Sequence, residues 1–436
     1  MTARPAPAES PPFSVVLPLL FLAPIGLVTA GLLLLNADGD TLVAINAPHT
    51  VAIVHAIALG WASTTIMGAS YQLLQAVLGG HIFSYRLARL QAAIHVVAVP
   101  LFVWAAYRWD TAWMALAGTL LATSFLLYSI LAATALARAS RRGVVHFGMA
   151  MGLIGLLVAF GFGLTWVGAL YHLWFPITLG LLSAHAHLGL IGWLGITILS
   201  VSEQLVPMFS LTSQRPSRLP WIAIGLTAVA VTLFASVLPF QPGVPVRVLL
   251  ALVLTVGPAV WAFGIVRGFR RRSRRKLDIH GRATMAALPC LLLAAVVGVG
   301  AAIGTPFTND AEPARWLLAY GALLLGGFVG ATLVGNSLKI VPFLIWIHRY
   351  QRLAGKAPVP VISDLVNVRL QHLALGLIVL GSYTVAAGSL AGSLLFIRAG
   401  GVIFAAGGVS LTGALWWSLL PAHSTRQPIG ARKATT

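Results

Sequence analysis

Charged side chains are scarce in this chain of 436 residues. Asp, Glu, Lys and Arg together make up 8% of it, and only 9 residues are acidic. Water-soluble domains carry about 25% charged residues, so this composition excludes an ordinary soluble protein. Hydrophobic residues reach 58%. We therefore predict an integral membrane protein whose main partner is the lipid bilayer.

Cysteine is also nearly absent. The single Cys290 cannot form an internal disulfide, and without a Cys-x-x-Cys-His motif covalent haem attachment is not indicated. No Gly-x-Gly-x-x-Gly or Walker pattern follows a strand, so the glycines are assigned to close helix packing. The net charge of +19 would suit a nucleic-acid binder. Because the basic residues lie in short loops between apolar segments, nucleic acid is excluded as a partner.

Twelve apolar segments reach the roughly 20 residues that a helix needs to cross the hydrocarbon core. They lie near 14–36, 51–77, 87–107, 112–136, 147–170, 177–206, 220–239, 246–266, 283–304, 314–344, 370–388 and 393–420. The expected fold is an all-α polytopic membrane bundle. A disordered tail is expected at 1–13, one membrane domain at 14–421 and a C-terminal tail at 422–436.

The loops alternate in charge along the chain. Loop 267–276 contains seven Arg and Lys residues, and the loops after the second, fourth, sixth and tenth spans are also basic. The alternate loops contain Asp38, Asp40, Asp310 and Glu312. By the positive-inside rule, both termini are predicted to be cytoplasmic, with the chain in the inner (cytoplasmic) membrane of the cell.

A motif at 183–209 occurs three times. Laid over the second span so that His187 falls on His55, it matches at eight positions without a gap, including Trp193 on Trp61. Laid over the tenth span, it matches at Gly327, Gly330, Thr332, Ser337, Val341 and Pro342, with Ala322 in place of His187. The pattern predicts three repeats of four spans, at about 14–140, 141–275 and 276–421.

His55 and His187 are the first candidates for a cofactor site. His55 lies about five residues into its span, roughly 7 Å below the outer boundary at ~1.5 Å per residue. The repeat places His187 in the same layer. An ionisable residue within a membrane is a functional candidate, and neutral imidazole ligates haem iron or a metal ion. The alternative is a histidine that only bonds a neighbouring helix.

Other residues have two or more roles open. His185 projects roughly 200° from His187 around a regular helix, so one helix cannot offer both rings to one metal. His95 and His372 fit a ligand, a proton relay or a satisfied polar residue. Glu203 is the only carboxylate placed within a span and is a proton-transfer candidate, and Pro207 follows it, where a helix can kink or stop.

Two tryptophans complete the candidate set. Trp61 and Trp193 each follow their histidine by six residues. They are expected either to line a cofactor slot or to serve in aromatic packing.

The chain resembles subunit I of the haem–copper oxidase superfamily, including its nitric oxide reductase branch. The resemblance rests on twelve spans in three groups of four and on the text of the second and third spans: His55, Gly60-Trp61, 67–74 (Met-Gly-Ala-Ser-Tyr-Gln-Leu-Leu) and 84–91 (Ser-Tyr-Arg-Leu-Ala-Arg-Leu-Gln). It implies a low-spin haem ligand at His55 and an active-site metal ligand at His187 or His185.

The chain departs from that family at two places. The family's His-His pair on the seventh span and its His-x-His on the tenth have no counterpart in 220–239 and 314–344. We therefore expect no complete haem–copper centre and no terminal oxidase. From the symmetry of the repeats we hypothesise a haem between the second and sixth spans, with His55 and His187 as its axial ligands.

The sequence thus predicts a membrane protein that binds haem, or a metal such as copper, and acts in electron transfer or in O2 or NO chemistry. Any catalysis would be of the oxidoreductase type. No soluble domain is present to dock an electron donor, so a separate donor subunit is expected. The alternatives are a twelve-span transporter of a small solute or metal ion, and a cofactor-free scaffold.

Overall fold

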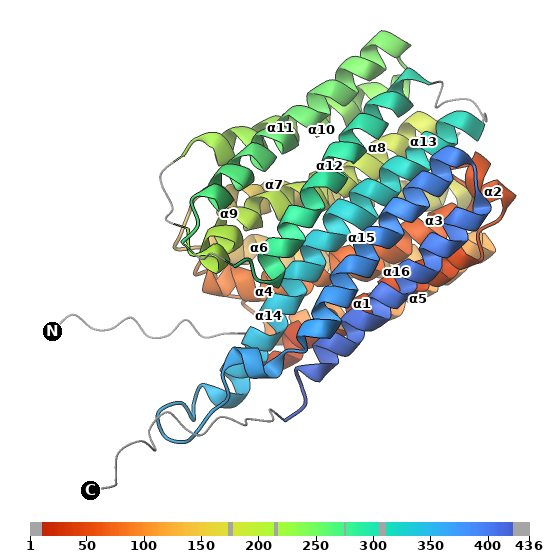
Figure 1. Cartoon of the computed structure of the whole chain (residues 1–436). Coiled ribbons are helices and arrows are strands. Elements are labelled where there is room, and N and C mark those ends of the chain that lie inside the picture. Colours follow the sequence, from red (N-terminus) through yellow and green to blue (C-terminus); the bar gives the residue numbers. More distant parts are fainter. Residues whose placement is uncertain (1–10, 173–177, 213–216, 274–275, 305–310, 422–436) are drawn as a thin grey trace, which may run out of the picture.

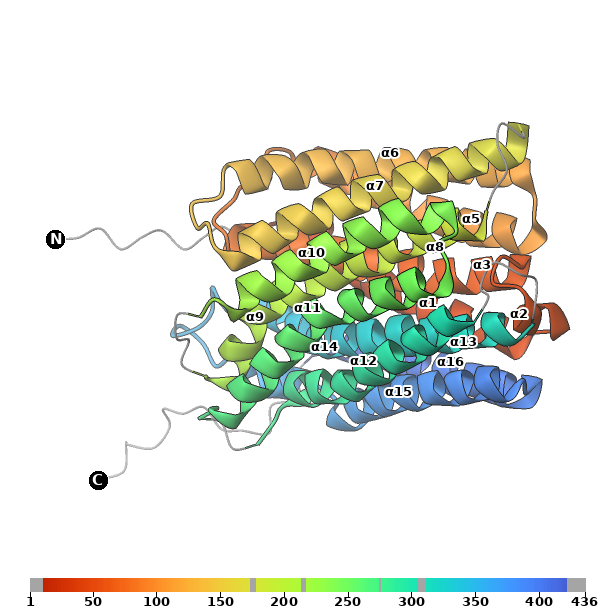
Figure 2. The same ribbon diagram turned by 90° about the horizontal axis from the view of Figure 1, so that it is seen from above.

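A computed structural model describes residues 11–172, 178–212, 217–273, 276–304 and 311–421. Within these ranges the regular structure is helical, and twelve helical spans are long and apolar enough to cross a membrane. The predicted polytopic all-α bundle is thus confirmed. Figures 1 and 2 show the spans side by side along one common direction.

Each group of four spans contains one composite helix. The first group is α1 (Phe13–Leu35), then α3 (Pro48–His55), η1 (Ala56–Ser63) and α4 (Thr64–Ala76) in one continuous span, then α5 (Tyr85–Arg108) and α6 (Thr111–Ala137). The second is α7 (Val144–His172), then α8 (Leu179–His187), η2 (Leu188–Gly195) and α9 (Ile196–Ser210), then α10 (Leu219–Val237) with η3 (Leu238–Phe240), and α11 (Val244–Arg270).

The third group follows the same order. It comprises α12 (Ile279–Ile303), then α13 (Ala311–Gly321), η4 (Ala322–Val329) and α14 (Gly330–Tyr350), then α15 (Val368–Ala391) and α16 (Leu394–Trp417). Two short helices lie in loops, α2 (Gly39–Val43) and η5 (Ile362–Leu365). The arrangement agrees with the three groups of four that the repeated motif predicts.

Polar side chains mark where many of the helices begin. Asp110 accepts a hydrogen bond from the backbone N–H of Trp113, and Asp278 accepts one from Gly281. The same N-cap arrangement occurs at Ser84, Thr178, Asn367 and Ser393. Such caps satisfy backbone donors that have no partner within the helix. They therefore fix where these helices begin.

Three π-helical segments, η1, η2 and η4, are the main departure from regular α-helix. They begin at Ala56, Leu188 and Ala322. Ala56 and Leu188 are equivalent positions of the sequence repeat. Ala322 lies one residue before the equivalent position in the third repeat. A π-helix widens the turn and shifts the register of the side chains that follow, and such segments are frequent at functional sites. The sequence did not indicate them.

The three π segments meet at the centre of the bundle, where each contacts the other two. We call the composite helices that contain them the central spans. In their most apolar windows 67%, 83% and 72% of the residues are buried, compared with 22% for α11. Large apolar side chains such as Leu249, Leu292 and Phe263 instead lie more than half exposed on the outside, which suits contact with lipid chains.

The glycines of the motif allow this close packing. A Cβ on Gly155 of α7 would lie 2.5 Å from the backbone oxygen of Gly192 in η2, and one on Gly26 of α1 would lie 2.6 Å from the backbone carbon of Gly60 in η1. In the third group Cys290 of α12 takes the corresponding place against Gly327. The expectation that these glycines serve helix packing is confirmed at these crossings.

Proline does not end the central spans. Pro207 lies inside α9, which continues to Ser210, and Pro342 lies inside α14, which continues to Tyr350. Of the two outcomes expected at Pro207, a kink or a stop, the stop does not occur. A proline in a helix removes one hydrogen bond, but membrane helices tolerate it where neighbouring groups compensate.

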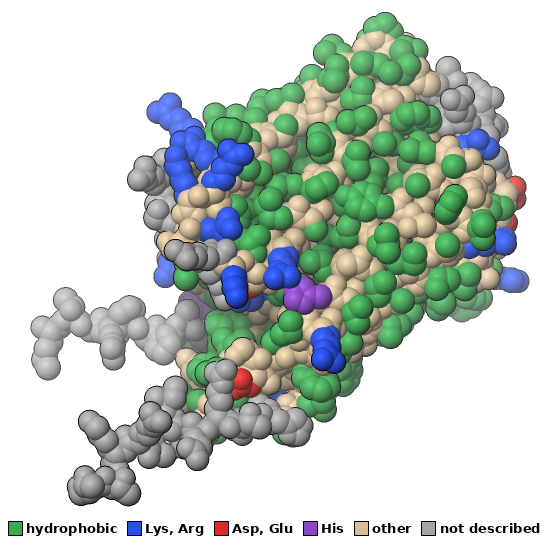
Figure 3. All heavy atoms as spheres, viewed as in Figure 1, with side chains coloured by type: hydrophobic (Ala, Val, Ile, Leu, Met, Phe, Trp, Pro, Cys, Tyr) green, Lys and Arg blue, Asp and Glu red, His purple; other side chains and the backbone are tan. Residues whose placement is uncertain are grey.

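The two ends of the bundle differ. The visible face is hydrophobic over its middle, with Lys and Arg side chains gathered toward the ends (Figure 3). Helix α1 begins and α16 ends at the same end, which also carries the loop between α11 and α12 with its cluster of arginines (Figure 1). We call this end the arginine-rich end and the opposite one, which carries α2, the far end.

Candidate histidine site

The candidate histidines lie where α-helix gives way to π-helix. His55 is the last residue of α3 and His187 the last residue of α8, each directly before a π segment, toward the far end. His185 lies in the last turn of α8. Ala322, which replaces the histidine in the third repeat, is the first residue of η4.

The rings of His55 and His187 are held in the same way. Nδ1 of His55 lies 2.7 Å from the carbonyl oxygen of Val51, and Nδ1 of His187 lies 2.8 Å from that of Ser183. A carbonyl oxygen only accepts hydrogen bonds, so Nδ1 must carry the hydrogen. In the neutral ring Nε2 is then left with its lone pair. Each ring therefore offers Nε2 as an acceptor or a ligand.

The ring of His185 is also held by a backbone carbonyl, which here belongs to another helix. Its Nδ1 lies 3.0 Å from the carbonyl oxygen of Ala159 in α7. This contact fixes the ring between two spans and again leaves the lone pair on Nε2. A backbone carbonyl bound to the second nitrogen is the usual support of a metal-ligating histidine.

His55 and His185 face each other across the bundle interior. Their ring centroids are 6.3 Å apart and their planes are inclined by 21°. Aromatic rings flank the pair: Phe102 of α5 has its centroid 5.0 Å from that of His55, and Trp166 of α7 has its centroid 5.9 Å from that of His185. The site is thus enclosed by the second, third, fifth and sixth spans.

His187 has different neighbours, which revises the pair expected from the repeat. Its ring lies 4.2 Å from that of Phe234 in α10, centroid to centroid. The hydroxyl of Tyr320 in α13 lies 3.3 Å from Nε2 of His187 and can donate to it. His185 and His187 project to different sides of α8, as their spacing predicted, and it is His185 that faces His55.

A cavity of about 310 Å³ opens beside these rings, and we call it the histidine cavity. His55, His185, His187 and Tyr320 all line it, together with many apolar side chains. Its other polar wall includes Ser63, whose hydroxyl accepts a hydrogen bond from the indole N–H of Trp193 at 3.1 Å.

The two tryptophans of the motif have separate roles. Trp193 lines the histidine cavity and packs on Tyr128 of α6, with ring centroids 5.9 Å apart. Trp61 is fully buried and its indole nitrogen has no hydrogen-bond partner among the described residues. Trp193 therefore shapes the cavity, whereas Trp61 serves in packing.

A second cavity, of about 710 Å³, adjoins the first. His187 and Tyr320 line both, so their hydrogen-bonded pair forms part of the wall between them. The remaining walls come mainly from η2, α10, α11, α12 and η4 and are largely apolar. They include one arginine, Arg247, whose guanidinium donates to the carbonyl oxygens of Ala302, Pro242 and Gly304.

Ligand count limits what the histidine site can hold. Over the described ranges, no group of three or more His, Cys, Asp or Glu side chains comes together as a metal site. Structural and catalytic zinc sites need three or four protein ligands. Two imidazoles are enough for a haem, whose porphyrin supplies the other four nitrogens.

His95 is not available as a ligand in this structure. It is completely buried, with Nε2 3.0 Å from the hydroxyl of Thr64 and Nδ1 3.3 Å from that of Ser124. Both ring nitrogens are therefore hydrogen-bonded, and the ring ties α5 to α4 and α6. Of its three open roles, the geometry favours the satisfied polar residue.

His372 lies apart from the other histidines. It is exposed near the start of α15, and its Nε2 lies 3.1 Å from the guanidinium of Arg282 in α12. Both helices begin at the arginine-rich end. The structure does not bring His372 to the histidine cavity, so a relay role there has no geometric support.

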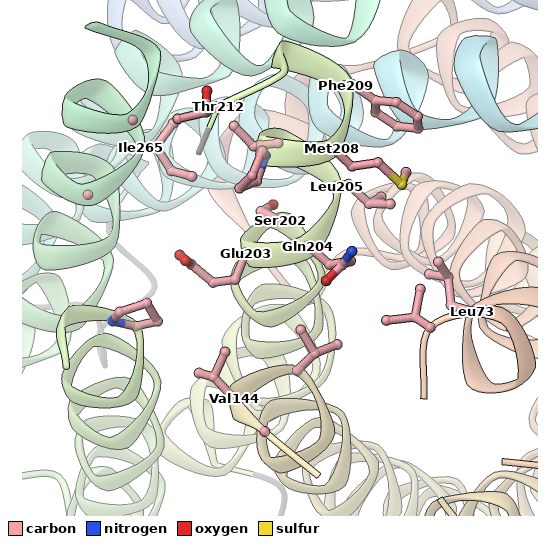
Figure 4. Close-up of a pocket in the computed structure, with 18 of the residues that line it drawn as sticks. Leu73, Val144, Ser202, Glu203, Gln204, Leu205, Met208, Phe209, Thr212 and Ile265 are labelled. Atoms are coloured by element: carbon pink, nitrogen blue, oxygen red, sulfur yellow. The ribbon is translucent and has the colours of Figure 1, made fainter. Parts of the chain in front are cut away.

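Glu203 lines a cavity of about 1350 Å³, which we call the Glu203 cavity. Figure 4 shows Glu203 and Gln204 leaving α9 in different directions, Gln204 on the side of Leu73. Four arginines also line this cavity, Arg141, Arg142, Arg267 and Arg271. From His187 to Glu203 the sixth span advances roughly 24 Å along its axis, so the two cavities are distinct.

Sequence reasoning missed several residues of the site, among them Tyr320 and Trp166. Tyr320 lies two residues before Ala322, so the alignment of the third repeat with the other two was a signal that could have found it. Trp166 lies outside the repeated motif, and no signal in the sequence singles it out.

The chain was also compared with known proteins. No family model matches it, and no curated protein is similar to it.

Proposed function

We propose that this membrane protein binds a haem between its second and sixth spans, with His55 and His185 as axial ligands, and that it serves electron transfer. The single observation that carries the proposal is the facing pair of histidines with both Nδ1 atoms held by backbone carbonyls. Haem ligation requires imidazoles whose Nε2 lone pair is available in an apolar site. The carbonyl contacts of Nδ1 leave Nε2 with its lone pair in both rings.

The spacing of the rings supports the same ligand. Two imidazoles that bind one metal ion through nitrogen at ~2.0–2.1 Å have centroids about 6 Å apart. The observed separation is 6.3 Å. The observed centroid separation is therefore close to that of two imidazoles bound to one metal ion. Of bare metal ions, a copper(I) ion is the alternative, because it accepts two ligands and imidazole suits copper.

The surroundings suit a flat, largely apolar cofactor. Phe102 and Trp166 contact the outer sides of the two histidines, and Trp193 adds a third aromatic wall. Gly163 leaves space beside the ring of His185, because a Cβ there would lie 3.1 Å from Cε1 of that ring. A Cβ at residue 163 would require the ring of His185 to shift by a few tenths of an ångström, and a larger side chain would displace it further.

A haem bound in this way would supply one-electron chemistry. If both histidines held its iron, no coordination position would stay open for a gas, which would favour electron transfer over O2 or NO chemistry. Each histidine keeps its tautomer through its carbonyl contact, and the apolar walls exclude water. Electron entry is assigned to a separate donor protein.

The relationship to haem–copper oxidase subunit I stays part of this proposal. It rests on the twelve spans in three groups of four and on the sequence of the second and third spans. The basic loops support an orientation with both termini in the cytoplasm, in the inner membrane. In this arrangement the histidine cavity lies in the outer half of the membrane.

The optical spectrum tests the proposal. The full chain would be expressed with haem supplied and purified in mild detergent, with metal analysis on the same sample. The expected result is a reduced-minus-oxidised spectrum with sharp bands of a six-coordinate haem and about one haem iron per chain. A colourless, metal-free protein would contradict the proposal.

A transporter is the second candidate, and the Glu203 cavity favours it. That cavity is large, lies in a membrane protein and combines a carboxylate with four arginines. Charged groups beside helices that carry a proline are common in transporter sites, and Pro207 lines the same cavity. Uptake of a small solute by proteoliposomes of a colourless protein would support this candidate instead.

A further inference from the structure

A small cavity of about 30 Å³ lies between the three central spans, on the side of the arginine-rich end. We call it the axial pocket. Besides Leu20 of α1, its walls come from α4, α9 and α14: Thr65, Ile66, Ala69, Ser70 and Leu73; Thr197, Ile198, Val201 and Leu205; and Leu333, Asn336, Ser337 and Ile340. The three sets largely occupy equivalent positions of the repeat.

Two apolar layers border this pocket. Ile66, Ile198 and Leu333 occupy one set of equivalent positions of the repeat and form one layer. Leu73, Leu205 and Ile340 are related in the same way, about two helical turns further along, and form the other. Residues spaced by three, four and seven lie on one helix face, so each set of three points to the common centre.

The equivalent position between the layers differs among the repeats. It is Ala69 in the first, Val201 in the second and Asn336 in the third. The small Ala69 leaves space that a larger side chain would fill. Asn336 adds a polar amide to an otherwise apolar centre.

Four polar atoms around the pocket have no hydrogen-bond partner in the described part of the chain. They are Oδ1 of Asn336, Oγ of Ser337, and Oγ1 of Thr65 and of Thr197. Ser337 and Thr65 are each 2% exposed. Asn336 also lies beside His280 of α12, but that contact leaves Oδ1 without a well-formed hydrogen bond. Buried oxygens without partners are rare, and an ordered water is the usual explanation.

The size of the pocket fits this explanation. A cavity needs roughly 10–15 Å³ for one water molecule, together with two to four polar partners. The pocket has about 30 Å³ and four such oxygens around it. A bare cation fits less well, because no charged side chain lines the pocket and a buried charge without a counter-charge is costly. Water can also donate to an oxygen that only accepts.

The axial pocket is separated from the Glu203 cavity by a single layer of side chains. Leu73, Leu205 and Ile340 line both spaces. Rings of apolar side chains of this kind control the passage of water in membrane pores. The layer is therefore placed to admit or exclude solvent from the arginine-rich end.

We propose that the axial pocket holds an ordered water molecule bound by Asn336, Ser337 and Thr65. This water exchanges with the Glu203 cavity through the layer formed by Leu73, Leu205 and Ile340. The site carries hydration from the arginine-rich end to the centre of the three repeats. It does not depend on haem binding.

Direct imaging is the first test. A cryo-electron microscopy map of the full chain that resolves water, at about 2 Å, is expected to show density within hydrogen-bond distance of these oxygens. A dry pocket would overturn the proposal. Density with the short contacts of a coordinated cation would overturn it as well.

Silver labelling tests the exchange route. In a Cys290→Ala background, Ser337→Cys is treated with Ag⁺, and the thiols left unprotected are alkylated after unfolding and counted by mass spectrometry. Ser129→Cys is the matched control. Ser129 of α6 is also buried, with an unpartnered hydroxyl, but it lines neither the axial pocket nor the Glu203 cavity.

The expected result is that Ag⁺ protects Ser337→Cys and leaves Ser129→Cys unprotected over the same time. Adding Leu205→Ala, which thins the apolar layer, should raise the rate at Ser337→Cys severalfold without changing Ser129→Cys. Equal rates at the two cysteines, or no response to Leu205→Ala, would overturn the route.

Discussion

The ring of His55 lies 6.3 Å from the ring of His185, centroid to centroid, although the two histidines belong to different repeats of the sequence. Two different helices hold these rings through backbone carbonyls, Val51 in α3 and Ala159 in α7. Of the two histidines of α8, His185 faces His55, whereas His187 lies within hydrogen-bond distance of Tyr320. The predictions below test the packing that creates this division and its chemical consequence.

Close backbone approach at Gly155 is the first testable feature. Gly155→Ala places a methyl group 2.5 Å from the backbone oxygen of Gly192, so α7 must move away from η2. We expect a loss of about 1–3 kcal/mol in the free energy of unfolding. Thermal unfolding in detergent measures it.

Gly161→Ala is the matched control on the same helix, because nothing lies within 4 Å of a Cβ there. Alanine is favoured over glycine in a helix by up to ~1 kcal/mol. Equal unfolding temperatures for the two variants would contradict the packing described for η2.

The hydrogen bond between Tyr320 and His187 is the second feature. Tyr320→Phe removes the hydroxyl 3.3 Å from Nε2 and leaves that nitrogen without this donor. We expect a loss of about 1 kcal/mol in the free energy of unfolding, with any bound haem retained. Tyr171→Phe is the control, because Tyr171 is 51% exposed. Equal free energies of unfolding for the two variants would show that the hydrogen bond between Tyr320 and His187 does not stabilise the fold.

The ion pair of Asp278 and Lys339 is the third. Burial raises the pKa of the Asp278 carboxyl, but hydrogen bonds from the Lys339 ammonium at 2.8 Å and from the Gly281 N–H outweigh this effect. The pKa therefore lies below its ordinary value. A depressed carboxyl pKa stabilises the fold above the unfolded pKa of about 3.9, and this stability is lost as the pH falls further.

Asp278→Asn keeps an oxygen to cap α12 and removes the charge. We expect the variant to unfold at a lower temperature than the wild type at pH 7, with the difference shrinking as the pH approaches 3. Unfolding temperatures measured from pH 7 to pH 3 give the comparison. A difference that stays constant over this range would show that the charge of Asp278 does not matter.

Space beside His185 is the fourth feature. Gly163→Val would press against Cε1 of the His185 ring, which lies 3.1 Å from the position of a Cβ. We expect the variant to fold but to bind less haem, because the added side chain displaces the ring from the position in which it faces His55. Haem content per chain measures the effect, and Gly161→Val, with open space around it, is the control. Equal haem content would contradict the placement of the ligand.

The spans and the repeated motif could be predicted because they depend on hydrophobic length and on identities at fixed offsets. The ligand pair could not. A histidine's direction depends on helix phase, and the π segments that follow His55 and His187 change the phase of the residues beyond them. The contact of His185 with Ala159 also needs the packing of α7 on α8, which no local pattern encodes.

The roles of the remaining candidates depend on neighbours in the same way. The sequence leaves His95 open as a ligand, a proton relay or a satisfied polar residue. In the structure, the hydroxyls of Thr64 and Ser124 are hydrogen-bonded to its two ring nitrogens. Glu203 was placed within a span without any indication that a cavity opens beside it. The sequence indicates which residues could act chemically. It does not indicate which residues of distant segments contact them.

The most direct measurement is haem content and optical spectrum for three variants of the full chain: His55→Ala, His185→Ala and His187→Ala. The account predicts that the first two lose the six-coordinate spectrum and most of the haem, while the third keeps both. Loss of the spectrum in His187→Ala with its retention in His185→Ala would contradict the central claim and restore the pair expected from the repeat.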